Sequence, residues 1–438
     1  MNASNRPNVV VYISHDTGRF IGPYGVATVQ TPNADRVAAE GAVFENSFCT
    51  APQCSPSRAG LFTGRYPHAN GVMGLTQGHF AWNLSDGQIH LAQRLKDLGY
   101  ATAVMGTTHE TRNDLETHKK IGFEFDTGWP FRLEKLPGAL NEFLAGNGGT
   151  GRPFYIQIGT AVTHRPFDLD GAEPDDSLGV TLLPYLAETP GTRKDFAALQ
   201  GSVKRWDEGL GDVLKALDSR GLADNTILVV TTDHGIAMPR AKCSLYDLGI
   251  GVLLLIRWPG GPVPAGARYE ELVSNVDVVP TLLEAVGGEA DGSIQGRSFW
   301  PLLAGGSYEQ RQEIFAEMTF HTYYDPMRCI RTQRYKYIRN FEMCPGMHMP
   351  GDVRRQPTFA ENAGLKLGQH PYEELYDLQS GPNELKNLAG DRACAEVRVR
   401  LCRALANWMR ATGDPLLEGP IPSPFYRKSV GDLLDSLY

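Results

Sequence analysis

The amino-acid sequence predicts an α/β fold with a large, mostly parallel central sheet, followed by a smaller α+β region with an antiparallel sheet. Over the first three-quarters of the 438 residues, short apolar runs alternate with helical patterns, as they do in parallel sheets covered by helices. The last quarter carries a segment in which polar and apolar residues alternate, which is typical of an antiparallel strand with one exposed face. Several apolar runs end directly in His or Asp, as strands that lead to a binding site do.

Five strands and three helices are expected in the first part of the chain. Asn8–Ser14 is a nearly continuous β-branched run, which indicates a strand buried on both faces. Two of the helices are followed by a glycine, a residue that commonly ends helices, and Asn33 after Pro32 is the predicted N-cap of the first. The further strands are expected at 101–105, 154–158, Thr226–Thr232 and 252–256, and the helices at 34–40, 86–98 and about 195–219.

The last part of the chain predicts a smaller unit of different character. Residues 328–339 alternate as one antiparallel strand would, and residues 374–378 form a further short segment before a terminal helix at about 395–411. We therefore expect an α/β domain over residues 1–324 and a C-terminal α+β subdomain over residues 325–438.

Composition and charge exclude several classes of protein. With 42% hydrophobic and 21% charged residues the chain has the profile of a soluble globular protein, and a net charge of −8 without a basic run argues against nucleic acid or a membrane surface as the main partner. The N-terminus shows no signal-peptide pattern and no apolar stretch approaches the roughly 18 residues of a membrane span, so a cytoplasmic location is expected. The seven cysteines are irregularly spaced, which suggests neither a disulfide framework nor a zinc finger.

Four of the expected strands lead to metal-binding or acid–base side chains. In an open α/β sheet, ligands bind beyond the carboxyl ends of the strands, so these side chains are expected to meet at one edge. A single polar residue in such a place is more often a cap or turn residue, but four strand ends that repeat the pattern favour a shared site. The residues are His15 and Asp16 after the first run, His109 and His164 after the runs at 101–105 and 154–158, and Asp233 and His234 after Thr226–Thr232.

The carboxylates Asp16 and Asp233 predict a bound cation. Two carboxylates at the ends of buried strands lie in a partly dehydrated place, where they need a cation or a proton. Carboxylate oxygens suit Ca²⁺ or Mg²⁺, whereas coordination by His15 or His234 would favour Mn²⁺ or Zn²⁺. A lone histidine at a strand end is more often a hydrogen-bonded structural residue, so the ligand set stays open at this point.

Cys54 lies in a motif that predicts an anion site. Ser55 and Pro56 suit the cap and first turn of a helix, which places Cys54 beside a helix N-terminus, where free N–H groups favour an oxyanion. Arg58 in the first turn can offset charge on such a group, and Lys242, in the loop that leaves the second carboxylate, could reach the same anion. An isolated cysteine is more often a small buried apolar residue, and most lysines are solvated. The spacing Cys-x-Pro-x-Arg in a chain with a carboxylate pair is far more specific.

The motif from Cys54 to Arg58, continued by Leu-Phe-Thr-Gly-Arg at 61–65, resembles the signature of the type I sulfatases, which belong to the alkaline phosphatase-like superfamily. The resemblance covers nearly the whole chain and is strongest toward the heparan N-sulfatase (sulfamidase) type. It implies an alkaline phosphatase-like sandwich, in which a formylglycine-generating enzyme has oxidised the cysteine at 54 to Cα-formylglycine. It also implies one divalent metal ion, for which Ca²⁺ is expected and Mn²⁺, Mg²⁺ and Zn²⁺ are alternatives.

By position, the resemblance implies roles for the residues of the predicted site. Metal ligands are expected at His15, Asp16, Asp233, His234 and the formylglycine at 54. Arg58 is expected to stabilise the hydrated aldehyde, His109 to hydrogen-bond it, and His164 and Lys242 to hold the sulfate and assist the leaving group. In the implied mechanism one hydroxyl of the hydrated formylglycine attacks sulfur, and the second, deprotonated with help from His109, then expels sulfate.

Three positions depart from the family pattern. His15 stands where an aspartate is usual, His234 where an asparagine is usual, and Thr107 where a lysine is common two residues before the histidine. The pocket thereby loses one positive charge, which keeps a phosphonate monoester or phosphodiester hydrolase on the same scaffold as the alternative. A non-catalytic protein that binds sulfated glycans is a further alternative, against which the intact catalytic positions argue.

We therefore expect a sulfatase that hydrolyses sulfate esters or N-sulfates of a small substrate, with a sulfated saccharide as one candidate. Residues in loops beside the matched segments are candidates for sugar contacts, although each is more often structural by itself. The resemblance also allows a homo-oligomer. The candidate sugar contacts are His79, Trp82, Thr107, His321, Tyr323, Tyr324 and Arg328.

Overall fold

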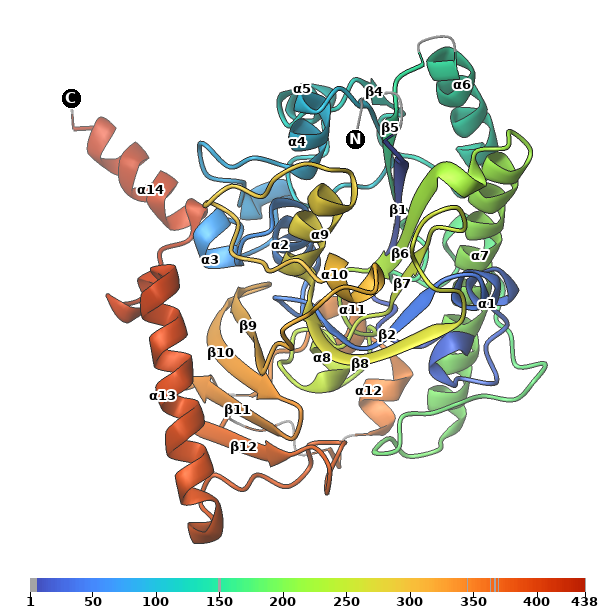
Figure 1. Cartoon of the computed structure of the whole chain (residues 1–438). Helices are drawn as coiled ribbons and strands as arrows, with labels where there is room; N and C mark the ends of the chain where they lie inside the picture. Colours follow the sequence, from blue (N-terminus) through green and yellow to red (C-terminus); the bar gives the residue numbers. More distant parts are fainter. Residues whose placement is uncertain are drawn as a thin grey trace.

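The computed structural model describes residues 6–148, 151–344, 346–362, 364–365, 368 and 370–437. Its larger sheet has eight strands in the order β4-β3-β5-β1-β6-β7-β2-β8 (Figure 1). The ladders that join β4, β3, β5, β1 and β6 are parallel, as is the β2–β8 ladder, whereas β7 is antiparallel to both neighbours. The predicted α/β fold with a mostly parallel sheet is confirmed. The strands are β1 (Asn8–Ser14), β2 (Ala42–Phe48), β3 (Ala101–Gly106), β4 (Phe125–Asp126), β5 (Phe154–Gly159), β6 (Thr226–Thr232), β7 (Leu254–Arg257) and β8 (Ala267–Ser274).

Helices cover both faces of this sheet because its central strands are apolar on both sides (Figure 1). From β1, Val10 and Tyr12 pack with α1, α6 and α7, whereas Val9, Val11 and Ile13 pack on the opposite face with α2, α4 and α9. Each such side chain stabilises the fold by about 1.5–3 kcal/mol when fully buried. The helices are α1 (Pro32–Ala39), α2 (Cys54–Thr63), α3 (Pro67–Asn70), α4 (Leu91–Asp97), α5 (Leu115–Lys120), α6 (Leu136–Gly148), α7 (Pro190–Asp218), α8 (Asp247–Ile250), α9 (Val278–Ala285), α10 (Trp300–Leu303), α11 (Gly351–Arg354), α12 (Pro357–Glu361), α13 (Ala395–Thr412) and α14 (Pro424–Asp435).

A second, four-stranded sheet forms the smaller α+β region, as predicted. Its antiparallel order is β12-β11-β10-β9, with β9 (Glu313–Phe320), β10 (Tyr324–Thr332), β11 (Tyr335–Asn340) and β12 (Glu373–Asp377). One face packs against residues near β2 and β8, and α13 covers the other with Leu401, Leu405, Trp408 and Met409. Because β9 belongs to this sheet and precedes residue 325, the sheet begins before the predicted boundary, and a division into two domains at 325 stays a prediction.

Three predicted helices begin elsewhere, and the one expected from about 195 starts earlier, at Pro190. The helix expected over 86–98 starts only at Leu91, because Gly87 has a left-handed φ of 80° and His90 caps the helix, its Nδ1 accepting a 3.0 Å hydrogen bond from Ala92 N–H. Ile89, expected on the apolar face, is 39% exposed. The first helix starts at Pro32 after Thr31, so Asn33 is not its cap.

The single strand predicted over 328–339 is wrong: the segment is a hairpin. Strands β10 and β11 are joined by a turn in which the Thr332 hydroxyl accepts a 3.0 Å hydrogen bond from Tyr335 N–H. Nor is one face exposed, because α13 and the larger core cover both faces of the sheet. Several charged side chains of this segment therefore lie in buried ion pairs, among them Lys336 with Asp247 at 2.6 Å and Glu384 at 2.8 Å, whereas Gln333 and Arg334 at the turn are exposed.

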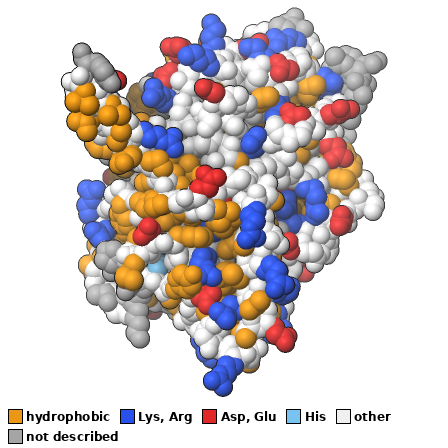
Figure 2. Space-filling view, turned by 90° about the vertical axis from the view of Figure 1, so that its left-hand side faces the viewer, with side chains coloured by type: hydrophobic (Ala, Val, Ile, Leu, Met, Phe, Trp, Pro, Cys, Tyr) orange, Lys and Arg blue, Asp and Glu red, His pale blue; other side chains and the backbone are white. Residues whose placement is uncertain are grey.

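Strands β2 and β8 and helix α14 are among several elements that were not predicted. The strands carry charged residues such as Glu45 and Glu270 that break the apolar pattern. Helix α14 leaves the body of the molecule at the end of the chain (Figure 1), with Phe425, Leu433 and Leu434 53–66% exposed. Hydrophobic side chains gather over much of the face seen in Figure 2. No helix among the described residues is long and apolar enough to span a bilayer.

Candidate active site

The four predicted strand ends lie next to one another at one edge of the larger sheet. Strands β3, β5, β1 and β6 are consecutive in it, and Ser14 at the end of β1 is in register with Thr232 at the end of β6. The residues that follow these two strands therefore meet: the backbone N–H of Asp16 donates a 2.9 Å hydrogen bond to Asp233 Oδ1. The parallel register thus places the two acidic residues in contact across adjacent strands.

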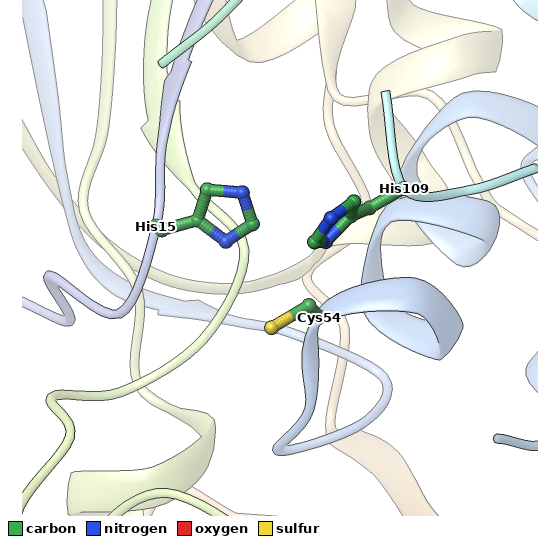
Figure 3. Close-up of side chains that lie close together, drawn as sticks. All are labelled: His15, Cys54 and His109. Atoms are coloured by element: carbon green, nitrogen blue, oxygen red, sulfur yellow. The ribbon is translucent and has the colours of Figure 1, made fainter. Parts of the chain in front are cut away.

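Cys54 is the first residue of α2 and lies in the same place. Its Sγ is 3.4 Å from His234 Nε2 and 3.9 Å from Asp16 Oδ1. The N-cap position of the helix is Gln53, whose side chain makes no capping hydrogen bond, and not Ser55 as predicted; all of the helix residues are buried. Figure 3 shows the Cys54 side chain pointing into the same space as His15 and His109, which come from separate segments. A group at position 54 therefore faces the strand ends from a helix N-terminus, where N–H groups lack intrahelical partners.

Both carboxylate oxygens of Asp233 contact buried polar groups. Its Oδ2 is 2.8 Å from His15 Nδ1 and 3.2 Å from Arg58 Nε, and its Oδ1 accepts hydrogen bonds of 2.9 Å from the backbone N–H groups of Asp16 and His234. Burial by itself would raise the pKa of Asp233, but His234, His15 and Arg58 hold that pKa well below its ordinary value. Asp233 is therefore an ionised carboxylate in a place without solvent.

Asp16 is the second ionised carboxylate. Its Oδ1 is 3.0 Å from His234 Nε2 and its Oδ2 accepts a 2.7 Å hydrogen bond from Lys242 Nζ. Burial opposes ionisation here too, yet Lys242 and His234 keep the pKa of Asp16 well below its ordinary value. The backbone of Asp16 has a left-handed φ of 46°, a strained conformation of the kind that collects at functional sites.

The residues around these two carboxylates fit one divalent cation. One ligand atom each from His15, Asp16, Cys54 and Asp233 lies within 4.8 Å of the others, and all four residues are buried. The Nδ1–H of His234 donates a 2.9 Å hydrogen bond to the Gly235 carbonyl, so Nε2, 3.0 Å from Asp16 Oδ1, is the ring nitrogen that faces the carboxylates. Against the effect of burial, Asp233 and Asp16 raise the pKa of His234 well above its ordinary value, so this nitrogen carries a proton that a cation would displace. Two buried carboxylates with imidazoles beside them suit a divalent ion, the carboxylates favouring Ca²⁺ or Mg²⁺ and the imidazoles Mn²⁺ or Zn²⁺.

Lys242 contacts both the site formed by Asp16 and Asp233, here called the carboxylate site, and a second group of polar residues. Its ammonium group is 3.3 Å from His164 Nε2 and 2.9 Å from Asp352 Oδ2, in addition to its contact with Asp16. His164 donates from Nδ1 to the Arg165 carbonyl, so its Nε2 is the acceptor that faces the lysine. Asp352, in α11, was missed in the sequence because no motif surrounds it; the one available signal is that a buried lysine requires carboxylate partners.

Arg58 and the loop after β3 complete the site. The fully buried guanidinium group donates to Asp233, to the Ser14 carbonyl at 3.0 Å and to the Thr107 carbonyl at 3.4 Å, so it acts as a fixed positive charge that ties three segments together. His109 has a left-handed φ of 63°. Its Nδ1 and the Thr107 hydroxyl are buried and have no hydrogen-bond partner among the described residues, which leaves both free to bind an anion.

The candidate sugar contacts divide into two groups. Trp82 packs in the core against Phe320, Arg328 is buried in an ion pair, and the Tyr324 hydroxyl accepts a hydrogen bond from Ile421 N–H, so these three have structural roles. His321 and Tyr323 remain partly exposed. Tyr323 stacks on His348 at 3.9 Å between ring centroids. The side chain of His79 lies outside the described residues.

Replacing Arg328 by methionine is expected to lower the free energy of unfolding by about 3–5 kcal/mol without changing KM for a sulfated substrate. The reason is that Arg328 holds Asp414 through hydrogen bonds of 2.6 and 3.0 Å in a place without solvent, and the variant leaves that carboxylate unpaired. Urea unfolding measures the loss, and the double variant Arg328→Met with Asp414→Leu should recover much of it. A raised KM with unchanged stability would contradict this structural role and support the predicted sugar contact of Arg328.

Comparison with known proteins adds to this geometry. The family model described as Sulfatase matches residues 7–288, and that described as N-sulphoglucosamine sulphohydrolase, C-terminal, matches residues 240–363. An ulvan-active sulfatase of Formosa agariphila is 30% identical, with 96% of this chain and 83% of the relative covered. The human N-sulphoglucosamine sulphohydrolase is 28% identical, with 94% and 92% covered. A phosphonate monoester hydrolase of Agrobacterium radiobacter, solved as a crystal structure, has a TM-score of 0.71 at 21% identity over 93% and 96% of the two chains, a likeness of fold.

Proposed function

The chain belongs to the sulfatase family, and from this premise we propose that it removes sulfate groups from sulfated saccharides, with Cys54 converted to formylglycine and one divalent cation, Ca²⁺ by preference, beside it. One observation carries the proposal: the side chain at position 54 contacts both His234 and Asp16 at the start of a buried helix. A saccharide is supported by the names of the two relatives, one active on ulvan and one on N-sulphoglucosamine.

The cation would be held by His15, Asp16, Asp233 and His234 together with the group at position 54. When present, the cation supplies Lewis acidity and hydrated formylglycine supplies two hydroxyl groups on one carbon. The chain's own residues set the charge around them. Arg58 keeps Asp233 ionised and oriented, because its Nε lies 3.2 Å from that carboxylate.

Two groups of the chain are placed to move protons. A ring nitrogen of His109 lies within 4.8 Å of Cys54 Sγ, so it can accept a proton from a hydroxyl at position 54. Burial, with His15 and Arg58 nearby, lowers the pKa of His109 well below its ordinary value, so the ring is neutral before that transfer. Lys242 donates toward His164 Nε2 at 3.3 Å, and this pair can pass a proton to the leaving oxygen or nitrogen. The positive charge of Lys242 also offsets the single negative charge of a sulfate ester.

The alternative substrate class is a phosphonate monoester or phosphodiester. His234 and Thr107 favour it, since each departs from the usual sulfatase residue, and the buried Thr107 hydroxyl offers a neutral donor where a lysine would add charge. A fold likeness to a phosphonate monoester hydrolase does not separate the two classes, because the same scaffold carries both.

Turnover of three substrates by one preparation decides between the classes. The protein is produced with a formylglycine-generating enzyme, loaded with Ca²⁺, and assayed with an aryl sulfate, glucosamine N-sulfate and an aryl phosphonate monoester. We expect kcat/KM to be highest for a sulfate, and Cys54→Ala from the same host to be inactive on all three. Cleavage of the phosphonate ester with both sulfates untouched would overturn the proposal. Mass analysis of the peptide that contains residue 54 shows in parallel whether the thiol has become an aldehyde.

A further inference from the structure

A second cluster of metal-binding side chains lies beside the active site and takes no part in the chemistry above. It consists of Cys243, which follows Lys242 in the chain, His321 after β9, and His348 before α11. One ligand atom of each lies within 4.8 Å of the other two. We propose that these three residues bind a Zn²⁺ ion, with a water molecule as the fourth ligand.

The chemistry of the cluster differs from that of the carboxylate site. A thiolate and two imidazoles are the ligands that select zinc, whereas Ca²⁺ and Mg²⁺ require oxygen. Zinc bonds of about 2.3 Å to sulfur and about 2.0–2.1 Å to nitrogen place tetrahedral ligand atoms roughly 3.5 Å apart. The separations in this cluster are all within 4.8 Å, so one ion can be shared by the three side chains. Cys243 and His348 are buried and His321 is partly exposed, so an ion would enter from the side of His321.

Unsatisfied polar atoms around His348 support a metal ligand at this position. Its Nδ1 and the Asp325 Oδ2 face each other at 3.7 Å, and neither has a hydrogen-bond partner in the described part of the chain, although both are buried. Histidines that bind metal commonly donate their second N–H to such a carboxylate. The Nε2 accepts a long hydrogen bond of 3.4 Å from Thr322 N–H, which an ion would displace. Burial, with His370 nearby, lowers the pKa of His348 to about 3, so the ring is neutral at pH 7, as a ligand must be.

Contacts with neighbouring residues position the three side chains in the absence of an ion. Cys243 has a left-handed φ of 64°, a conformation that is unfavourable for a non-glycine residue, and its N–H donates a 2.9 Å hydrogen bond to the Pro52 carbonyl. The rings of His321 and His348 meet edge to face at 5.6 Å between centroids. Tyr323 stacks on His348 at 3.9 Å between ring centroids. Strain of this kind is maintained at sites where a side chain must point in one direction.

Titration with Co²⁺ tests the proposal on the full chain. Excess Ca²⁺ is present, so that the carboxylate site is filled, and absorbance is recorded as Co²⁺ is added. We expect one equivalent to give a thiolate-to-cobalt charge-transfer band and the strong visible bands of a tetrahedral ion, both removed by Zn²⁺. Cys243→Ser should lose the charge-transfer band. Cys54→Ser and Cys329→Ser, which change buried cysteines outside the cluster, should keep it.

Two further variants keep the test decisive should Cys243→Ser fail to fold. His321→Ala changes a partly exposed residue and should abolish the tetrahedral bands. Asp325→Asn should weaken Zn²⁺ binding by about 10–100-fold, since it removes the negative charge beside His348 and keeps the three proposed ligands. Absence of a thiolate band in the unmodified chain would overturn the proposal, as would a band that survives Cys243→Ser and disappears in Cys54→Ser. The latter would place the ion in the carboxylate site.

Discussion

Replacement of Cys54 by serine is expected to lower kcat for sulfate hydrolysis by a factor on the order of 10⁴ or more. The geminal diol of hydrated formylglycine can expel sulfate with its second hydroxyl, whereas serine offers one hydroxyl and leaves a sulfate ester that must await water. Water has poor access, because residue 54 is 3% exposed and begins α2 opposite the ends of β1 and β6. We therefore expect at most one turnover, measured as a burst of product equal to the enzyme present.

Mass analysis of the peptide that contains residue 54 distinguishes the causes of inactivity. Cys54→Ser incubated with substrate should gain the mass of one SO₃ group, and Cys54→Ala should gain nothing. Cys49→Ser is the matched control, since Cys49 is also a buried free cysteine shortly before α2, and its activity should stay near that of the unmodified chain. Steady turnover by Cys54→Ser at the original rate would show that formylglycine is not the nucleophile.

The carboxyl-end cluster of the sheet was predictable because its signals are local. The run Asn8–Ser14 is apolar on both faces, and the acidic residue that follows it has a counterpart after β6, so a parallel register is enough to bring Asp16 and Asp233 together. The Cys-x-Pro-x-Arg spacing likewise predicts a helix N-terminus at Cys54, which the structure has. In each case, residues close in sequence determine the geometry.

The remainder of the site depends on contacts that local patterns do not encode. Asp352 reaches Lys242 from 110 positions further along the chain, through a segment without periodicity. Arg328 resembles an exposed strand residue in the sequence, because alternation does not show that α13 covers the second face of the sheet. Even the local prediction of α4 fails at its start, since the capping bond of His90 competes with the apolar pattern before it.

Substitution of Asp16 by asparagine is expected to weaken binding of the divalent cation by at least about 100-fold, and to abolish turnover at low metal concentration as chelation does in the unmodified chain. Substitution of a residue that only hydrogen-bonds to a metal ligand lowers metal affinity by about 10–100-fold. Asp16 is expected to matter more, because it is one of two ionised carboxylates in the cluster around Cys54. Calorimetric titration with Ca²⁺ measures the affinity, and excess Ca²⁺ should restore part of the activity because Asp233 remains.

Asp352→Asn is the control that separates loss of a metal ligand from disturbance of Lys242. Asp16 and Asp352 contact the same ammonium group, at 2.7 and 2.9 Å, but only Asp16 belongs to the cluster with His15, Cys54 and Asp233. Removal of the Asp352 charge should leave Ca²⁺ affinity within a few-fold and alter KM and the pH profile, since Lys242 then pairs with Asp16 alone. Equal losses of Ca²⁺ affinity in the two variants would mean that the carboxylates act through the lysine, and that the cation lies elsewhere than between the ends of β1 and β6.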